Sequence, residues 1–186
     1  MTTPAPPPGP PRQLRPTDVK RLNRDWKRRT EGRVSLILDS VAQPFNVGSV
    51  VRTAAAFGAE KLWLCGNTPD LSLPAVGKTA LGTDRYLTVV REHSPAAAAK
   101  AAAEEGFRTV AVELANGALP LFEAPLDGDI CLVIGNEDHG CAPATLAAVH
   151  AVAYIPQPSR VGSFNAAIAA GIVLSEVRRR EWTAGG

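Results

Sequence analysis

Residues 34–58 decide the fold and read VSLILDSVAQPFNVGSVVRTAAAFG. Val34 to Leu38 is a short run dominated by branched apolar residues, which is typical of a strand buried on both faces. A polar loop starts at Asp39, and Gly48 to Phe57 then has the composition of a helix that Gly58 ends. A buried strand, a loop and a helix in this order predict the repeating unit of an α/β sheet.

The same alternation continues along the chain. We expect further strands at Lys61–Cys65, Tyr86–Val90, Thr109–Val112, Ile130–Ile134 and Val152–Ile155. We expect further helices at Pro95–Glu105 with Ser94 as N-cap, at Pro143–Val149 and at Asn165–Arg180. Strands that alternate with helices predict an α/β fold with a mostly parallel sheet and helices on both faces.

The N-terminal segment differs from the rest in composition. Residues 1–16 hold seven of the sixteen prolines and predict a disordered tail. Residues 17–31 predict a basic helix, capped by Thr17 and ended by Gly32, and residues 32–182 the main domain. Between Arg12 and Arg33 nine Lys/Arg stand against three Asp/Glu, a balance of +6. Such an arm indicates either a polyanion partner or a solvated helix face.

The remaining composition narrows the class of protein. No apolar stretch approaches the roughly 18 residues of a membrane span, and the N-terminus has no apolar signal segment. Cys65, Cys131 and Cys141 are far apart and lack metal-ligand spacing, so we expect a reduced cytoplasmic protein with neither a metal nor a membrane partner. Phosphate-loop, dinucleotide-binding, zinc-protease and nucleophile-elbow motifs are absent.

Ligands of parallel sheets bind beyond the carboxyl ends of the strands, so three loops are candidates for the site. In the first, Asn46 lies at the loop end and Arg52 lies about a turn into the helix, near a terminus that attracts anions. The alternative is that Asn46 caps the helix and Arg52 pairs with a surface carboxylate. From these residues alone both interpretations stay open.

The second and third loops follow Ile134 and Ile155. The second reads GNEDHG (135–140), where paired glycines allow close approach of a ligand and Glu137 offers a carboxylate. His139 is either a general base or a bystander in an exposed turn. In the third loop Ser163 and Asn165 are polar candidates that the capping of the last helix would equally explain.

In this order and spacing, the three loops together resemble the SpoU–TrmH family of the SPOUT superfamily. The motifs are NVGSVVRT (46–53) with AFG (56–58), LVIGNEDHG (132–140), and IP (155–156) followed by SFN (163–165) and AAGI (169–172). The resemblance covers about residues 33–180. Each motif is weak by itself, whereas the set is specific.

The resemblance implies an S-adenosylmethionine-dependent RNA ribose 2′-O-methyltransferase whose C-terminal segment forms a deep trefoil knot. It implies that Gly135, Ile155 and Phe164 line the cofactor pocket with Val112 nearby. It places the catalytic arginine at Arg52 and the supporting polar residues at Asn46, Glu137, Ser163 and Asn165. It also implies a homodimer with the last helix and the first motif's helix near the interface, so that Arg52 can serve the cofactor of the other subunit.

Three positions depart from the family pattern. Phe164 stands where leucine is usual, Ser159 where glycine is frequent and Ala167 where serine is frequent. None of them removes a polar group assigned to catalysis. The departures therefore bear on the RNA target more than on the activity.

The short basic helix, without a separate RNA-binding domain, resembles the subgroup that methylates guanosine in tRNA. Ribosomal RNA is the alternative target, and a non-catalytic RNA-binding protein of the same fold or a small-molecule-binding α/β protein are alternative functions. The segment Lys78–Gly82 either contacts RNA or ends a helix. We expect Arg52 to position the ribose and stabilise charge, because free arginine titrates above ~12. Glu137 is expected to orient Arg52 or the loop.

Overall fold

The computed structural model describes residues 12–184 and divides into two compact units, one up to Thr30 and one from Glu31 onward. Of the predicted tail, residues 1–11 lie outside the described residues.

The first unit consists mainly of helix α1, Pro16–Arg28. The predicted cap at Thr17 is wrong, because the N-cap is Arg15 and Pro16 occupies the first helical turn, where its fixed φ favours helix initiation. The helix also ends before Gly32, at Arg28. Val19, Leu22 and Trp26 fall on one face as predicted, and no residue of α1 is buried.

The second unit is built on a seven-stranded sheet in the order β3-β2-β1-β6-β4-β7-β5, and every neighbouring pair is parallel. The strands are β1 (Val34–Asp39), β2 (Lys61–Cys65), β3 (Thr88–Glu92), β4 (Arg108–Val112), β5 (Leu119–Pro120), β6 (Ile130–Ile134) and β7 (Ala151–Tyr154). Every residue of β1 and β6 is buried. The predicted parallel sheet is confirmed.

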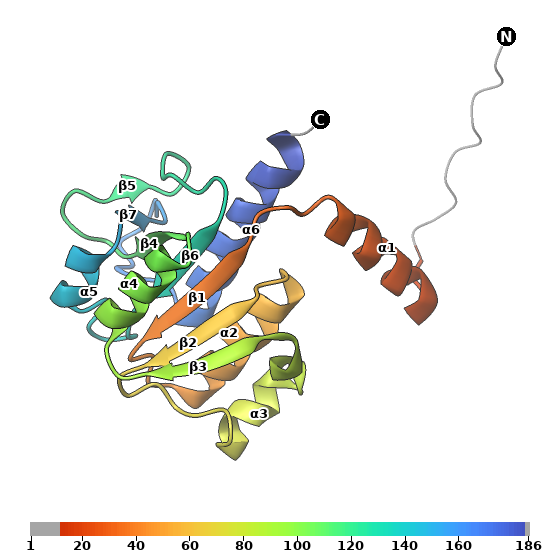
Figure 1. Ribbon diagram of the computed structural model, residues 1–186, viewed down its shortest axis with the longest axis horizontal. Helices are drawn as coiled ribbons and strands as arrows, with labels where there is room; N and C mark the ends of the chain where they lie inside the picture. Colours follow the sequence, from red (N-terminus) through yellow and green to blue (C-terminus); the bar gives the residue numbers. More distant parts are fainter. Residues whose placement is uncertain (1–11, 185–186) are drawn as a thin grey trace, which may run out of the picture. The chain divides into compact units, whose positions relative to one another are not determined.

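Helices cover both faces of this sheet, as predicted (Figure 1). Helices α2 (Pro44–Ala56), α3 (Pro74–Ala80) and α6 (Ala166–Ala184) pack against one face with Leu36 and Leu38 of β1. Helices α4 (Pro95–Glu104) and α5 (Pro143–Ala148) pack against the other face, where Ile37 points. Ser94 caps α4 by accepting from the Ala97 amide, as the sequence predicted.

Several boundaries differ from the prediction. Helix α2 begins at Pro44 instead of Gly48, because the proline starts the first turn. The segment around Tyr86 forms a 3-10 helix, η1 (Thr83–Tyr86), so β3 begins only at Thr88. Helix α3 and the two-residue strand β5 were not predicted. Both are too short to leave a periodic pattern in the sequence.

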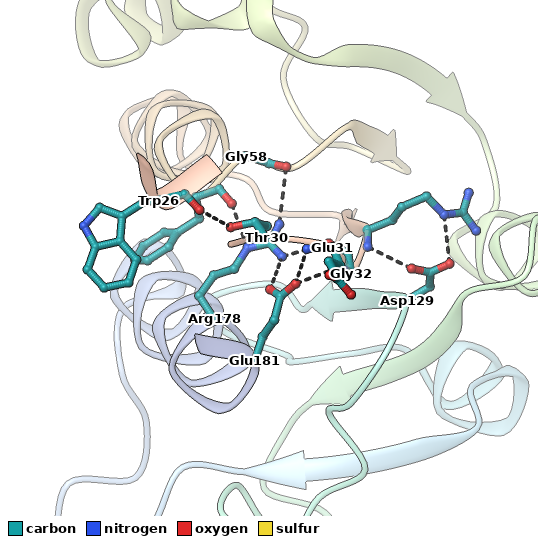
Figure 2. A network of polar contacts seen from close by, with 10 residues as sticks. Trp26, Thr30, Glu31, Gly32, Gly58, Asp129, Arg178 and Glu181 are labelled. Carbon is teal, nitrogen blue, oxygen red and sulfur yellow. Dashed lines mark hydrogen bonds and ion pairs between the residues drawn. The ribbon is translucent and has the colours of Figure 1, made fainter. Parts of the chain in front are cut away.

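A buried ion pair ties the end of α6 to the start of the second unit (Figure 2). The Arg178 side chain is only 2% exposed and donates to a Glu181 oxygen at 2.7 Å. It also donates to the carbonyls of Phe57 and Gly32 at 3.0 and 2.8 Å. The other Glu181 oxygen accepts from the Gly32 amide at 2.7 Å and from the Glu31 amide. Segments about 120 to 150 positions apart in sequence are thus joined through two charged side chains.

Candidate active site

Helix α2 presents different residues to three neighbours. Val47, Val50 and Val51 are buried against the sheet. Gly48 faces α3, where a Cβ in its place would lie 2.3 Å from the Val76 carbonyl oxygen. On another flank Thr53 approaches Gly171 of α6. Since Asn46 precedes Thr53 by two helical turns, it lies on the flank that faces α6.

Asn46 connects the three predicted loops through its amide group. Its Nδ2 donates to Glu137 Oε1 at 2.7 Å, and its Oδ1 accepts from Asn165 Nδ2 at 2.9 Å. The expectation that Asn46 ends the loop is wrong, because it lies in the first turn of α2. Asn165 Oδ1 accepts from the Ala167 and Ile168 amides, so it also caps α6. Both interpretations of Asn165, cap and site residue, are therefore compatible with its contacts.

Glu137 is held as an ionised carboxylate. Burial alone would raise its pKa, but hydrogen bonds from the Asn46 side chain and from the Ala42 and Gln43 amides together hold the pKa of Glu137 below its ordinary value. A carboxylate with a lowered pKa is a weak proton acceptor. Glu137 thus fixes the loop after β1 and the Asn46 amide, and it contacts neither Arg52 nor a proton relay.

The glycines of the loop after β6 are required by its close turns. Asn136 and Gly140 pair through two backbone hydrogen bonds, and Gly140 has a left-handed φ of 67°. A Cβ on Gly135 would lie 2.4 Å from the Cys141 nitrogen. The Asn136 side chain donates to the Ser40 carbonyl at 2.7 Å, which joins this loop to the loop after β1. The turn leaves the backbone of Gly135 open toward a pocket.

That pocket lies beyond the carboxyl ends of β4, β6 and β7, the position expected for ligands of a parallel sheet. All four predicted cofactor residues line it, as do Glu137 and Ser163 of the predicted catalytic set. These residues are Val112, Gly135, Ile155, Phe164, Glu137 and Ser163. The structure therefore brings the loops after β6 and β7 together around one cavity.

The lining of the pocket is acidic. Among the described residues that form it are three carboxylates, Glu113, Glu137 and Asp138, and no lysine or arginine. Glu113 accepts from the Cys141 amide at 2.9 Å and lies against Gly140, so it supports the glycine turn. The sequence analysis missed Glu113, although it directly follows β4 and the carboxyl-end rule points to it. Such a pocket favours a cationic ligand.

Arg52 is not part of the pocket. It is six residues beyond Asn46, which places it about 120° around α2 and about 9 Å along it. Its side chain is exposed, and among the described residues it has neither a hydrogen bond nor an ion pair. The alternative that it pairs with a surface carboxylate is therefore wrong. Of the two roles expected for Glu137, orienting Arg52 or orienting the loop, its contacts support the second. Its guanidinium is available to another molecule.

His139 lines the pocket but its ring has no hydrogen-bond partner among residues 12–184. Only its backbone amide is engaged, with Asn136 Oδ1 at 3.1 Å. A general base is normally oriented by a second group. The geometry gives His139 no such support.

A family model described as the SpoU rRNA methylase family matches residues 33–175. The 23S rRNA guanosine-2′-O-methyltransferase RlmP of Bacillus subtilis is 32% identical over 143 residues, which are 77% of this chain and 57% of that protein. The chain spans about half the length of the curated relatives it matches.

Two solved structures are similar in sequence and fold. The SpoU methyltransferase AviRb of Streptomyces viridochromogenes, in complex with AdoMet, is 28% identical with a TM-score of 0.73, over 84% of this chain and 63% of that one. A structure concerned with 2-OH methylation of C/U34 on tRNA is 31% identical with a TM-score of 0.69, over 81% of this chain and 92% of that one. The second of these structures is therefore matched over most of both chains.

Proposed function

The chain belongs to the SpoU rRNA methylase family, and from this premise we propose that it methylates ribose 2′-hydroxyls of RNA with S-adenosylmethionine. The observation that carries the proposal is the hydrogen-bonded series Glu137–Asn46–Asn165. It joins the three family motifs beside one acidic pocket.

The residues of the pocket fit this cofactor. S-Adenosylmethionine carries a sulfonium and an ammonium against one carboxylate, so its net positive charge suits a lining with three acids. A Cβ on Gly135 would collide with the backbone of Gly140 and Cys141, so this glycine permits the close turn that forms one wall of the pocket. Val112, Ile155 and Phe164 supply apolar walls. We assign cofactor binding to these four residues.

When bound, the cofactor supplies an electrophilic methyl group and departs as a neutral thioether. The chain's own residues have to hold the ribose oxygen in line and take up the charge that develops when the hydroxyl loses its proton. We assign the positioning to Asn46, Ser163 and Asn165. Arg52 contacts the hydroxyl or its adjacent phosphate, and the released proton passes to solvent.

The exposed face of α6 supports a homodimer. Residues Ala166 to Ser175 include no charged side chain, and Ile168 is 55% exposed on this helix. An uncharged surface of small and apolar residues beside α2 is suited to an isologous contact with a second copy. Such a contact would bring Arg52 of one subunit near the pocket of its partner. We also propose that the C-terminal segment forms a deep trefoil knot.

For the substrate we propose tRNA. The structure concerned with tRNA is 31% identical and is covered to 92% by this chain, so the similarity spans almost all of that chain. Ribosomal RNA is the second candidate, because relatives such as RlmP act on 23S rRNA. The three free cysteines are all buried, which agrees with a reduced, cytoplasmic location. No helix among the described residues is long and apolar enough to cross a membrane.

The proposed function is tested with purified full-length protein, methyl-labelled S-adenosylmethionine and separate tRNA and rRNA fractions. We expect label in tRNA, recovered after nuclease digestion as a 2′-O-methyl nucleoside identified by mass spectrometry. Label in rRNA alone selects the second candidate. Absence of label from both fractions, with cofactor binding intact, contradicts the proposed activity.

The basic helix α1 gives a separate prediction about RNA affinity. Lys20 and Arg24 are exposed and one helical turn apart. Replacing both with glutamine should reduce the slope of log affinity against log salt by about 1.4 to 1.8, because two phosphate contacts are lost. Lys100→Gln with Arg108→Gln is the matched control on the second unit. An equal slope in the two double variants would show that α1 is only a solvated helix.

A further inference from the structure

A surface formed by the end of α3 and by η1 lies on the flank of α2 that faces away from α6. Gly48 contacts α3 and Thr53 contacts α6, and these positions are about 140° apart around α2. We define the α3–η1 surface as Lys78, Leu81, Arg85 and Tyr86. It is distinct from the acidic pocket and from the uncharged face of α6.

The cations of this surface are not neutralised. Within residues 31–184, five cationic side chains donate to no carboxylate or backbone carbonyl: Arg52, Lys78, Arg85, Lys100 and Arg160. Lys78 and Arg85 belong to the α3–η1 surface, and Arg52 lies on the neighbouring helix. Asp84 is the carboxylate of η1, so the three cations leave a net charge of about +2 at neutral pH. A cationic surface of this kind complements phosphate groups.

An aromatic ring projects from the same surface. Tyr86 is 62% exposed, although the Arg85 guanidinium lies 4.8 Å from its ring centroid and donates to its hydroxyl at 2.9 Å. The contact holds the ring and the cation in a fixed relation. Exposed aromatic rings beside arginine are the groups on which unpaired bases stack.

The backbone before η1 is strained at an exposed position. Leu81 has a left-handed φ of 51°, and its side chain is 60% exposed. The left-handed region costs a residue with a Cβ roughly 1 to 2 kcal/mol. This conformation is the left-handed C-cap that ends α3, with the Leu81 amide donating to the Gly77 carbonyl at 3.0 Å. The turn leaves the Leu81 side chain exposed beside η1.

We propose that the α3–η1 surface binds a single-stranded segment of the substrate RNA next to the nucleotide that is methylated. Tyr86 stacks on one base, while Lys78 and Arg85 contact the adjoining phosphates. The proposal rests on the proposed RNA substrate and adds a second contact region to it. Because Arg52 lies on α2 between the flank that faces α3 and the flank that faces α6, the RNA follows the exposed side of α2.

The test compares two substitutions at equally exposed aromatic residues. Tyr86→Leu removes the ring but retains an apolar side chain, and Phe122→Leu is the matched control, because Phe122 is 63% exposed near β5. RNA affinity is measured by fluorescence anisotropy with the tRNA that the full-length enzyme methylates. Tyr86→Leu should weaken affinity about 5- to 100-fold, the range that stacking of one base supplies. The control should stay within about twofold of the wild type.

Further measurements distinguish a failure of the α3–η1 proposal from a failure of the proposed function. Affinity for S-adenosylmethionine should be unchanged in Tyr86→Leu, and the KM for RNA should rise while kcat is retained. If Tyr86→Leu binds RNA as tightly as the Phe122→Leu control does, the proposal that the α3–η1 surface binds RNA is wrong, but the proposed function is unaffected. If the unaltered enzyme methylates no RNA, the proposed function itself fails. A change in the oligomeric mass of Tyr86→Leu would identify the surface as a protein interface and contradict the proposal.

Discussion

Replacing Arg178 with alanine is expected to lower the free energy of unfolding by about 3 to 5 kcal/mol, because it removes a buried guanidinium and leaves the partly buried Glu181 carboxylate without its cation. The Arg178 side chain is 2% exposed and also donates to the Phe57 and Gly32 carbonyls, which would lose their partner. The loss is measured by urea unfolding at neutral pH. It should appear as a lower midpoint with little change in slope.

Arg179→Ala is the matched control for this prediction. Arg179 is the next residue of the same helix and pairs with Glu176 at 2.7 Å, but its side chain is 58% exposed. Exposed pairs contribute about 0 to 1 kcal/mol, so this variant should unfold close to the wild type. Equal losses of unfolding free energy in Arg178→Ala and Arg179→Ala would contradict a larger contribution of the Arg178–Glu181 pair. Arg178→Met should recover part of the packing but not the stability that the ion pair contributes.

The Arg178 effect should depend on pH in a defined direction. Burial raises the pKa of Glu181, but the Gly32 amide, the Arg178 guanidinium and the Glu31 amide together hold it below the ordinary 4.5. A group whose pKa is lowered by folding contributes stability above its unfolded pKa and loses it as pH falls through the folded value. The difference between wild type and Arg178→Ala should therefore shrink below pH 4.5.

The strands were predictable because each central one is a short, almost wholly apolar run, such as Ile130–Ile134. Helix α3 was not, since seven residues with an internal glycine give no helical period. The position of Arg178 was missed for another reason. It follows Leu174 by four residues and so lies on the buried face, but it is the first of three consecutive arginines, and their composition does not single out one for burial. Only the tertiary partners Glu181, Gly32 and Phe57 make its burial possible.

The candidate site was predictable in position and less so in contacts. The carboxyl-end rule and the motif spacing selected Asn46, Glu137 and Asn165. Their hydrogen bonds could not be read from the sequence, because they depend on α2 starting at Pro44 and on the turn of the loop after β6. The helix start at Pro44 also places Asn46 in the first turn of α2 instead of at the end of the loop.

Replacing Arg52 with alanine is expected to reduce kcat/KM for RNA about 100- to 1,000-fold, the usual loss when a donor to a developing oxyanion is removed. Binding of S-adenosylmethionine should be unaffected, because Arg52 does not line the pocket. Arg85→Ala is the matched control for the loss of an exposed cation, and it should raise the KM for RNA without lowering kcat. Methyl transfer to tRNA is measured under single-turnover conditions. Full activity of Arg52→Ala with intact cofactor binding would exclude the assignment.

The exposed position of Arg52 allows a sharper experiment on where it acts. Arg52→Ala is mixed with Glu137→Ala, a variant expected to be inactive because Glu137 lines the pocket and holds the Asn46 amide. If Arg52 serves the pocket of its partner, one site in each mixed dimer holds an intact arginine and an intact pocket. Random exchange should then restore about a quarter of the wild-type activity, since half of the dimers are mixed and each has one complete site. Action within one subunit restores none, because no site in any of the dimers is complete. Mass measurements of the mixture, made under the assay conditions, distinguish that outcome from failure to dimerise.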